Sequence, residues 1–202
     1  HREEYSQQPS DPDDPAPDFS PTDLDTESGS VTVQETRETY RALLDRMESL
    51  FTDFQQGVGD LDDLEGLKPV LDDFLTYVRK NPASISILTQ IEDYDDMTFN
   101  HSVNTCIFSI VYGDRAGFDK EHLFDLAFGS LLHDFGKTQL PLSLIQKDGE
   151  LSDSEFEDIK KHPEEGRRLL KKFDPSSVAW KIAGEHHERP DGSGYPRGVE
   201  KI

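Results

Sequence analysis

Apolar side chains recur at steps of three and four residues along most of this 202-residue chain, the spacing that places them on one face of an α-helix. No segment keeps the strict alternation of apolar and polar residues that a half-buried β-strand shows. The first apolar stripe starts near residue 33 and stops at Gly57. The sequence therefore predicts an all-α fold, in which the helices bury these stripes against one another.

A second stripe covers residues 70–78, and Pro69 is tolerated in the first turn of its helix. Pro82 pushes Asn81 out of the helical region and ends that helix. A short helix is expected over residues 83–91. These N-terminal stripes predict two or three packed helices, and they are also the expected surface of a homodimer.

The helix expected over residues 98–115 carries apolar side chains on two sides. They include Phe108 and Tyr112, which predicts a helix buried over most of its circumference. Asp119 is suited to cap the following helix, which is expected to run on until Gly136 stops it.

Three further helices are expected towards the C-terminal end. Ser152 and Glu155 have the spacing of a capping box for a helix that ends near Lys161. Pro163 opens the next helix, and the last one spans about residues 176–188. Its inward-facing side chains are expected to be Val178, Ala179, Ile182 and Ala183.

The first 30 residues have a composition of their own. Nine acidic side chains, one basic side chain and five prolines leave almost no apolar side chains there. Such a segment buries too little to offset its ordering entropy, which predicts a disordered acidic linker over residues 1–30. Because the chain lacks an initiating Met, we expect a further domain before the linker.

The whole chain is acidic, with 42 Asp and Glu against 21 Lys and Arg and a formal net charge of -21. That field argues against a general affinity for nucleic acid polymers or anionic membranes. The sequence contains neither an apolar run of about 20 residues nor a signal peptide. A lone Cys106 excludes an intramolecular disulfide and fits a reducing compartment, so a cytoplasmic protein is expected.

Histidines and one aspartate end the apolar stripes of the C-terminal helices. Any one of these histidines, taken alone, is best read as a core residue bonded to a backbone carbonyl. Together they exceed the four ligands of a closed zinc site and suit two ions bridged by Asp134. A purely structural di-metal site is the alternative. The predicted metal ligands are His101, His133, Asp134, His162, His186 and His187.

Nearby residues are suited to a phosphate. Lys137 follows Asp134 by three residues, where its ammonium can reach an anion, although a C-terminal lysine also complements a helix dipole. In the run DGSGYP, Gly192 and Gly194 permit unusual backbone angles, and Tyr195 offers a ring to stack on a base. In isolation this run is an ordinary turn, but it lies only a few residues after the His pair.

This order of motifs, an upstream His, HD-x-GK, a later His and then HHE-x-x-DGSGYP, resembles the HD-GYP domain. That family consists of bacterial metal-dependent phosphodiesterases of cyclic di-GMP. The resemblance implies an HD-domain helical bundle over residues 93–202, with its C-terminal part missing. Residues 31–92 are then an N-terminal helical region that precedes this catalytic core.

The resemblance also implies roles for individual residues. His101, His133 and Asp134 bind the first metal, with Asp134 bridging to the second. The second metal's own ligands are His162, His186 and His187. Lys137 contacts a substrate phosphate, and the substrate or regulatory partners lie beside Gly194, Tyr195 and Pro196.

Two departures from the family pattern matter. Members with a third metal carry Glu four residues before the first His, where this chain has Met97, so we expect a binuclear site. The family also has a further Asp ligand after the signature loop, beyond Ile202. The chain as given is therefore expected to fall short of full metal affinity and activity.

The expected function is hydrolysis of cyclic di-GMP to pGpG or GMP in bacterial second-messenger signalling. Two divalent ions suit a phosphodiester because they activate water and neutralise charge on the phosphoryl oxygens. Iron or manganese is expected rather than zinc. A diguanylate cyclase domain is an expected partner through the GYP loop. The alternatives are a non-catalytic cyclic di-GMP sensor or interaction module and a phosphohydrolase of another cyclic dinucleotide.

Overall fold

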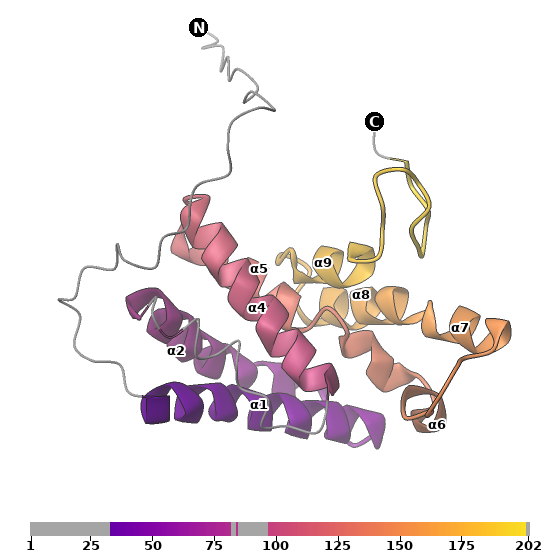
Figure 1. Cartoon of the computed structure of the whole chain (residues 1–202), viewed down its shortest axis with the longest axis horizontal. Coiled ribbons are helices and arrows are strands. Elements are labelled where there is room, and N and C mark those ends of the chain that lie inside the picture. The colour runs from indigo at the N-terminus through magenta and orange to yellow at the C-terminus, as the bar shows by residue number, and fades with distance from the viewer. Residues whose placement is uncertain (1–32, 82–83, 85–96, 201–202) are drawn as a thin grey trace, which may run out of the picture.

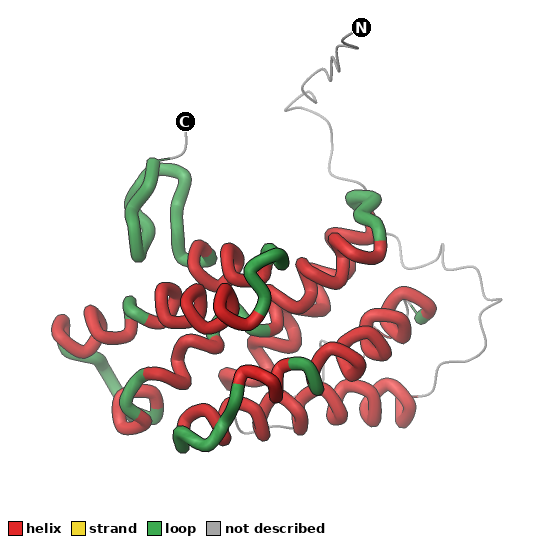
Figure 2. Tube along the Cα trace, turned by 180° about the vertical axis from the view of Figure 1, so that it is seen from behind, coloured by secondary structure: helices red, strands yellow, loops and turns green. Residues whose placement is uncertain are grey.

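The computed structural model describes residues 33–81, 84 and 97–200 of the chain (Figure 1). The linker expected over residues 1–30 and the short helix expected over residues 83–91 lie outside this part. Within it the chain forms helices and loops without a β-strand, apart from an isolated bridge between Asp191 and Glu200 (Figure 2). The all-α prediction is confirmed.

The described elements follow one another along the chain in this order: α1 (Val33–Gln55), the 3-10 helix η1 (Leu61–Leu64), α2 (Leu67–Lys80), α4 (Met97–Arg115), α5 (Lys120–Leu131), the 3-10 helix η2 (Phe135–Gln139), α6 (Leu142–Ile145), α7 (Asp153–Ile159), α8 (His162–Phe173) and α9 (Ala179–Glu185). None of these helices is both long and apolar enough to cross a membrane.

Local side-chain chemistry sets several of the helix ends as expected. The Asp119 side chain accepts a hydrogen bond from the His122 backbone N–H at the start of α5. Ser152 and Glu155 form a capping box at the start of α7. Pro163 lies in the first turn of α8, where its missing N–H leaves no helical bond unmade.

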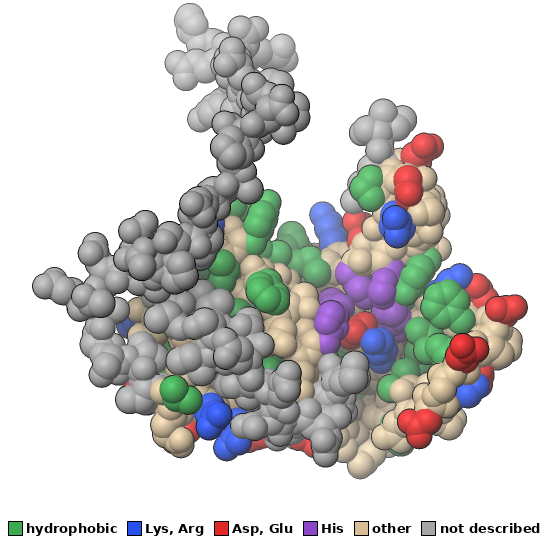
Figure 3. All heavy atoms as spheres, in the orientation of Figure 1, with side chains coloured by type: hydrophobic (Ala, Val, Ile, Leu, Met, Phe, Trp, Pro, Cys, Tyr) green, Lys and Arg blue, Asp and Glu red, His purple; other side chains and the backbone are tan. Residues whose placement is uncertain are grey.

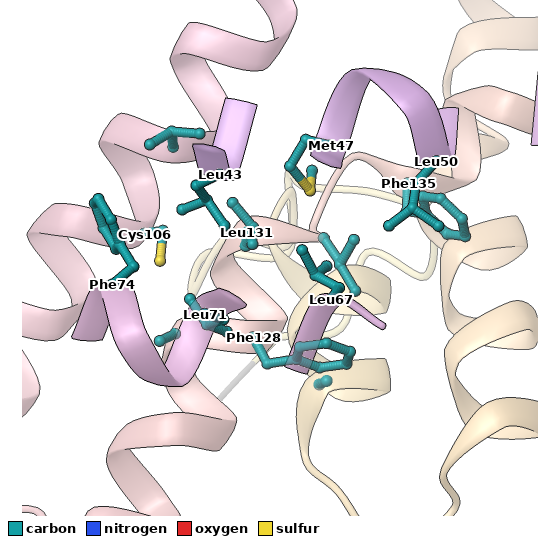
Figure 4. Packing of buried hydrophobic residues seen from close by; sticks show 14 of the residues in the cluster. Leu43, Met47, Leu50, Leu67, Leu71, Phe74, Cys106, Phe128, Leu131 and Phe135 are labelled. Atoms are coloured by element: carbon teal, nitrogen blue, oxygen red, sulfur yellow. The ribbon is translucent and has the colours of Figure 1, made fainter. Parts of the chain in front are cut away.

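The core joins the N-terminal helices to the rest of the chain. Buried side chains of α1 and α2 form one cluster with those of α4, α5, η2, α8 and α9 (Figure 4). Phe135 of η2 makes edge-to-face contacts with two aromatic rings of α1, at 5.2 Å from Phe51 and 4.7 Å from Phe54. The predicted regions 31–92 and 93–202 therefore share a core, and the boundary between them stays a prediction.

Gly136 allows η2 and α8 to lie unusually close. A Cβ atom on Gly136 would overlap the carbonyl oxygen of His162 and the amide nitrogen of Gly166, both on α8. Because these are backbone atoms, neither can move aside cheaply. The absence of a side chain at Gly136 therefore brings the turn after α5 against the start of α8.

Two expectations for α4 and α5 are wrong. Phe108 and Tyr112 of α4 are 60% and 70% exposed, because the described helices that pack most closely on α4, which are α1, α2 and α5, leave these two side chains uncovered. Helix α5 ends at Leu131 and does not continue to Gly136. His133 and Asp134 instead occupy a turn, followed by η2.

The last helix is also shorter than expected. It spans Ala179–Glu185 and not residues 176–188. Before its start Ser177 Oγ and the Val178 backbone N–H donate to the carboxylate of Asp125, and after its end His186 and His187 lie in a turn. Val178 precedes α9 and is exposed, contrary to its expected inward position. Ala179 and Ala183 are buried as expected.

We expect Phe135→Ala to lower the free energy of unfolding by about 3–5 kcal/mol, because it removes a fully buried ring between α1 and the turn at Asp134. Urea unfolding followed by circular dichroism measures this change. Phe156→Ala is the control, since Phe156 is an exposed ring. Equal effects of the two substitutions would contradict the placement of Phe135 in the core.

Candidate metal centre

Asp134 is a buried carboxylate in the turn between α5 and η2. One of its oxygens, Oδ2, lies 2.7 Å from Lys137 Nζ and 3.3 Å from His133 Nε2. The other, Oδ1, lies 3.1 Å from His162 Nε2 and 3.6 Å from His186 Nε2. Three elements of the chain therefore direct imidazole rings at one carboxylate.

The opposite nitrogen of each ring is bonded to the backbone three residues earlier. The Nδ1 atoms of His133, His162 and His186 lie 2.7, 2.7 and 2.8 Å from the carbonyl oxygens of Ser130, Ile159 and Ala183. A carbonyl oxygen only accepts, so each Nδ1 carries the hydrogen. In the neutral ring this leaves a lone pair on each Nε2, pointed at Asp134.

These lone pairs face a carboxylate that is also an acceptor. The Nε2 atoms of His162 and His186 are only 3.2 Å apart, and Asp134 Oδ1 is buried without a hydrogen-bond partner. Acceptors that converge in this way are favourable only around a cation. Backbone-oriented imidazoles around a carboxylate are the donor set that divalent metals bind, so the residues present fit a metal.

The charge states of these groups agree with metal binding. Burial raises the pKa of Asp134, but the Lys137 ammonium 2.7 Å away, together with the imidazoles of His133, His162 and His186 when these carry a proton on Nε2, holds the pKa well below its usual range. Burial and the neighbouring His186 and His162 lower the pKa of His187 to about 4. Asp134 is thus ionised and His187 neutral at pH 7, the forms in which both bind metals.

The ligand atoms fall into two groups that share Asp134. Asp134, His162, His186 and His187 offer atoms within 4.8 Å of one another, and so do His101, His133 and Asp134. Figure 3 shows histidine side chains gathered in a hollow on one face, beside acidic and basic side chains. All six residues that the sequence singled out are therefore brought together, and Lys137 lies with them.

The loop after α9 lies against one edge of this cluster. The Tyr195 ring stacks on the His187 ring, with centroids 4.4 Å apart and planes at 21°, and its backbone N–H bonds His187 O. A Cβ atom on Gly194 would overlap backbone atoms of residues 187–189, so only glycine permits this approach. One face of the Tyr195 ring is thus covered by His187, and stacking of this ring on a base stays a prediction.

Glu188 holds this loop in place, a role that the sequence analysis did not assign. Its side chain is 3% exposed and accepts hydrogen bonds from the backbone N–H groups of Arg197, at 2.7 Å, and Val199, at 3.2 Å. The available signal was the Glu that directly follows the His pair. A buried carboxylate at that point needs partners, and the returning loop supplies them.

A family model of the HD domain matches residues 88–201, which is more than half of the chain. The chain belongs to the HD domain family. Membership of the HD domain family implies that the chain binds divalent metal, and the cluster of His and Asp side chains described above agrees with this. The resemblance to HD-GYP proteins, inferred from the motifs, is also confirmed by the relatives described next.

This HD domain is 30% identical to the cyclic di-GMP phosphodiesterase PA4108 of Pseudomonas aeruginosa, over 75% of the chain and 36% of the relative. It is 34% identical to the cyclic di-GMP phosphodiesterase of Thermotoga maritima, over 58% of the chain and 33% of the relative. It is also 34% identical to the 3′3′-cGAMP-specific phosphodiesterase 1 of Vibrio cholerae, over 54% of the chain and 26% of the relative. The chain therefore spans only about a quarter to a third of these relatives.

A solved structure confirms the fold of this HD domain. It is Bd1817, an HDG"Y"P protein from Bdellovibrio bacteriovorus, with a TM-score of 0.69 and 24% sequence identity. The match covers 87% of this chain and 56% of that chain.

Replacing Glu188 is expected to release the loop of this HD domain. In Glu188→Gln the amide nitrogen cannot accept a hydrogen bond, so one of the two loop N–H groups loses its partner. We expect trypsin to cleave after Arg197 roughly tenfold faster, the effect of one lost bond to a charged acceptor. Mass spectrometry of timed digests locates and measures the cut.

The matched control is Glu185→Gln, which removes the side-chain pair with the Arg197 guanidinium and leaves the backbone bonds of Glu188 intact. Its cleavage rate is expected to stay within a few fold of the unsubstituted protein. If both variants are cut at the same rate, Glu188 does not hold the loop.

Proposed function

We propose that this protein hydrolyses the 3′–5′ phosphodiester bond of cyclic di-GMP, giving pGpG or GMP, in bacterial second-messenger signalling. The observation that carries the proposal is one buried carboxylate, Asp134, shared by two groups of histidines with a lysine ammonium beside it. The names of the relatives support the reaction type, since they are phosphodiesterases of cyclic dinucleotides.

In this proposal two divalent ions are held by the two groups. His101 and His133 would bind the first ion and His162, His186 and His187 the second, with Asp134 common to both. When bound, the ions supply Lewis-acid activation of the phosphodiester and of water. Iron or manganese is preferred over zinc, because sites of His and carboxylate with open positions suit octahedral ions.

Lys137 is assigned to the substrate phosphate. Its side chain is 26% exposed, and its ammonium lies beside the Asp134 carboxylate, so it presents a positive charge at the edge of the cluster. A charge fixed there before substrate arrives stabilises the negative charge that grows on the phosphoryl oxygens. Asp134 in turn fixes the position of that ammonium.

Tyr195 is assigned to the same substrate, together with its neighbours Gly194 and Pro196. Burial, and then the charge of Asp134, raise the pKa of the Tyr195 hydroxyl, so the group keeps its proton at neutral pH. A protonated hydroxyl can donate a hydrogen bond to a phosphate oxygen. Stacking on His187 fixes the ring for this purpose.

The partners are proposed on similar grounds. The loop of residues 189–200 extends from the helical body (Figure 1), which makes it the proposed surface for a diguanylate cyclase domain. The apolar stripes of α1 and α2 are buried in the core of the protein, so a homodimer would form through another surface. A cytoplasmic location stays a prediction.

Substituting Asp134 and Lys137 separates metal binding from catalysis. Asp134→Asn is expected to lose both ions, because one carboxylate serves both groups. Lys137→Ala is expected to keep its metal and to lose about 10²–10³-fold in kcat on cyclic di-GMP, as for the loss of one charge-stabilising donor. Metal analysis and chromatography of the products measure the two effects.

Lys120→Ala is the control, since Lys120 is an exposed lysine paired with Asp72 far from the cluster in sequence. Binding of cyclic di-GMP to the metal-loaded protein without any product would contradict the enzyme and favour a sensor. Turnover of a different cyclic dinucleotide alone would keep the chemistry and change the substrate.

A further inference from the structure

A cavity of about 320 Å³ has Lys137 in its lining and no histidine among its described lining residues. It lies between the C-terminal half of α1, the first turns of α4 and the short helix α6. Its lining includes Glu48, Phe51, Gln55, Phe99, Lys137 and Gln146. The motifs of the sequence left it unassigned, because half of these residues come from the N-terminal helices.

One side chain, that of Lys137, connects the cavity to the candidate metal centre. Lys137 lines the cavity, and its Nζ atom lies 2.7 Å from Asp134 Oδ2. A ligand whose phosphate is bound at Lys137 therefore has its next few atoms at the cavity mouth. The volume is at the small end of ligand sites, which is enough for a purine nucleoside but not for a whole cyclic dinucleotide.

The floor of the cavity is aromatic. Phe51 and Phe99 are largely buried and pack edge to face, with ring centroids 5.2 Å apart. Aromatic rings offer a planar base a favourable stacking or edge contact. This floor suits a flat heterocycle better than a sugar or a flexible chain.

The polar rim is rich in hydrogen-bond acceptors. Glu48 lies one and two turns before Thr52 and Gln55 on the same face of α1, and it makes no hydrogen bond or ion pair with any residue that the structure describes. The amide nitrogen of Gln55 donates to Leu140 O at 2.8 Å, which leaves its oxygen for the cavity. Among the described residues of the lining, Glu48 is the one acid, and it shares the cavity with the phosphate-binding lysine.

We propose that this cavity is a guanine subsite in which Glu48 reads the base. Among the standard bases guanine alone has two adjacent donors, N1–H and the N2 amino group, and a carboxylate accepts from both. Adenine would turn its N1 lone pair towards Glu48, and the two acceptors would repel. The inference rests on the proposed function, since it takes the scissile phosphate to lie at Lys137.

The comparisons leave this choice of base open. Relatives of similar identity are called cyclic di-GMP phosphodiesterases and 3′3′-cGAMP-specific phosphodiesterases. Glu48 gives a physical reason for this chain to prefer a substrate that places guanine in the cavity.

Glu48→Gln is the direct test, in the metal-loaded full-length protein. The substrates are cyclic di-GMP, cyclic di-AMP and bis(p-nitrophenyl) phosphate, which has no base. The unsubstituted protein should prefer cyclic di-GMP over cyclic di-AMP by at least about tenfold in kcat/KM. Glu48→Gln should remove most of this preference, because an amide can pair with adenine, and should leave bis(p-nitrophenyl) phosphate hydrolysis unchanged.

Glu38→Gln is the matched control, because it removes the same charge from α1 about 15 Å further along the helix axis. It should keep the preference. If Glu48→Gln keeps it too while bis(p-nitrophenyl) phosphate is hydrolysed, the guanine subsite is wrong and the phosphodiesterase stands.

A second measurement is independent of turnover. Calorimetric titration with GMP and AMP should show tighter binding of GMP to the unsubstituted protein, and Glu48→Gln should lose this difference. If no phosphodiester is cleaved but this difference is found, the proposed function fails and the guanine subsite is retained. Equal binding of GMP and AMP to the unsubstituted protein would overturn the subsite.

Discussion

A carboxylate buried among imidazoles constrains the whole C-terminal part of this structure. Taking the charge of Asp134 out of water carries a large penalty unless positive groups approach it closely. The turn after α5 lies against the start of α8 and the end of α9, with the Nε2 atoms of His162 and His186 at 3.1 and 3.6 Å from Asp134 Oδ1, a donor set that can hold such a positive charge. Gly136 permits that approach by presenting no side chain to the backbone of α8. The aromatic contacts of Phe135 then fix the same turn against α1 from the other side.

Much of this arrangement could be predicted from the sequence, because caps and motifs are local signals. The capping box at Ser152 and the first-turn Pro163 set helix ends as expected. The six metal-binding candidates were found because buried stripes that end in histidines are chemically unusual. The periodicity of apolar residues does not predict burial where tertiary packing determines which side of a helix is covered. The spacing of apolar residues places Phe108 and Tyr112 on one side of α4. It does not reveal that this side is left uncovered by the other described helices.

The geometry of the site depends on contacts between distant residues, and the spacing of residues along the sequence does not predict such contacts. The sequence is compatible both with a helix that continues through Asp134 and with the turn that the structure has. In the turn, one carboxylate oxygen of Asp134 faces His133 and the other faces His162. Tyr195 was expected to stack on a base, which stays a prediction, and the structure adds that one face of its ring covers His187. The signature loop thus packs against His187, a proposed metal ligand. Glu188 holds the loop by accepting hydrogen bonds from the backbone of Arg197 and Val199. Residues of this loop therefore position the proposed metal ligand His187, in addition to their proposed contact with a substrate.

The negative charge of the chain raises the question of how an anionic dinucleotide could reach the site. A formal net charge of -21 repels such a ligand at long range. Acids near the loop are partly neutralised, since Glu185 and Glu188 pair with Arg197. Attraction must then come from short-range charges, which include Lys137, Lys160, Arg189 and the proposed ions. In that setting Glu48, which lines the same cavity as Lys137, would only add repulsion unless the ligand brings donors to it. A base with two N–H groups does so, and the same carboxylate then excludes ligands that carry only their negative charge.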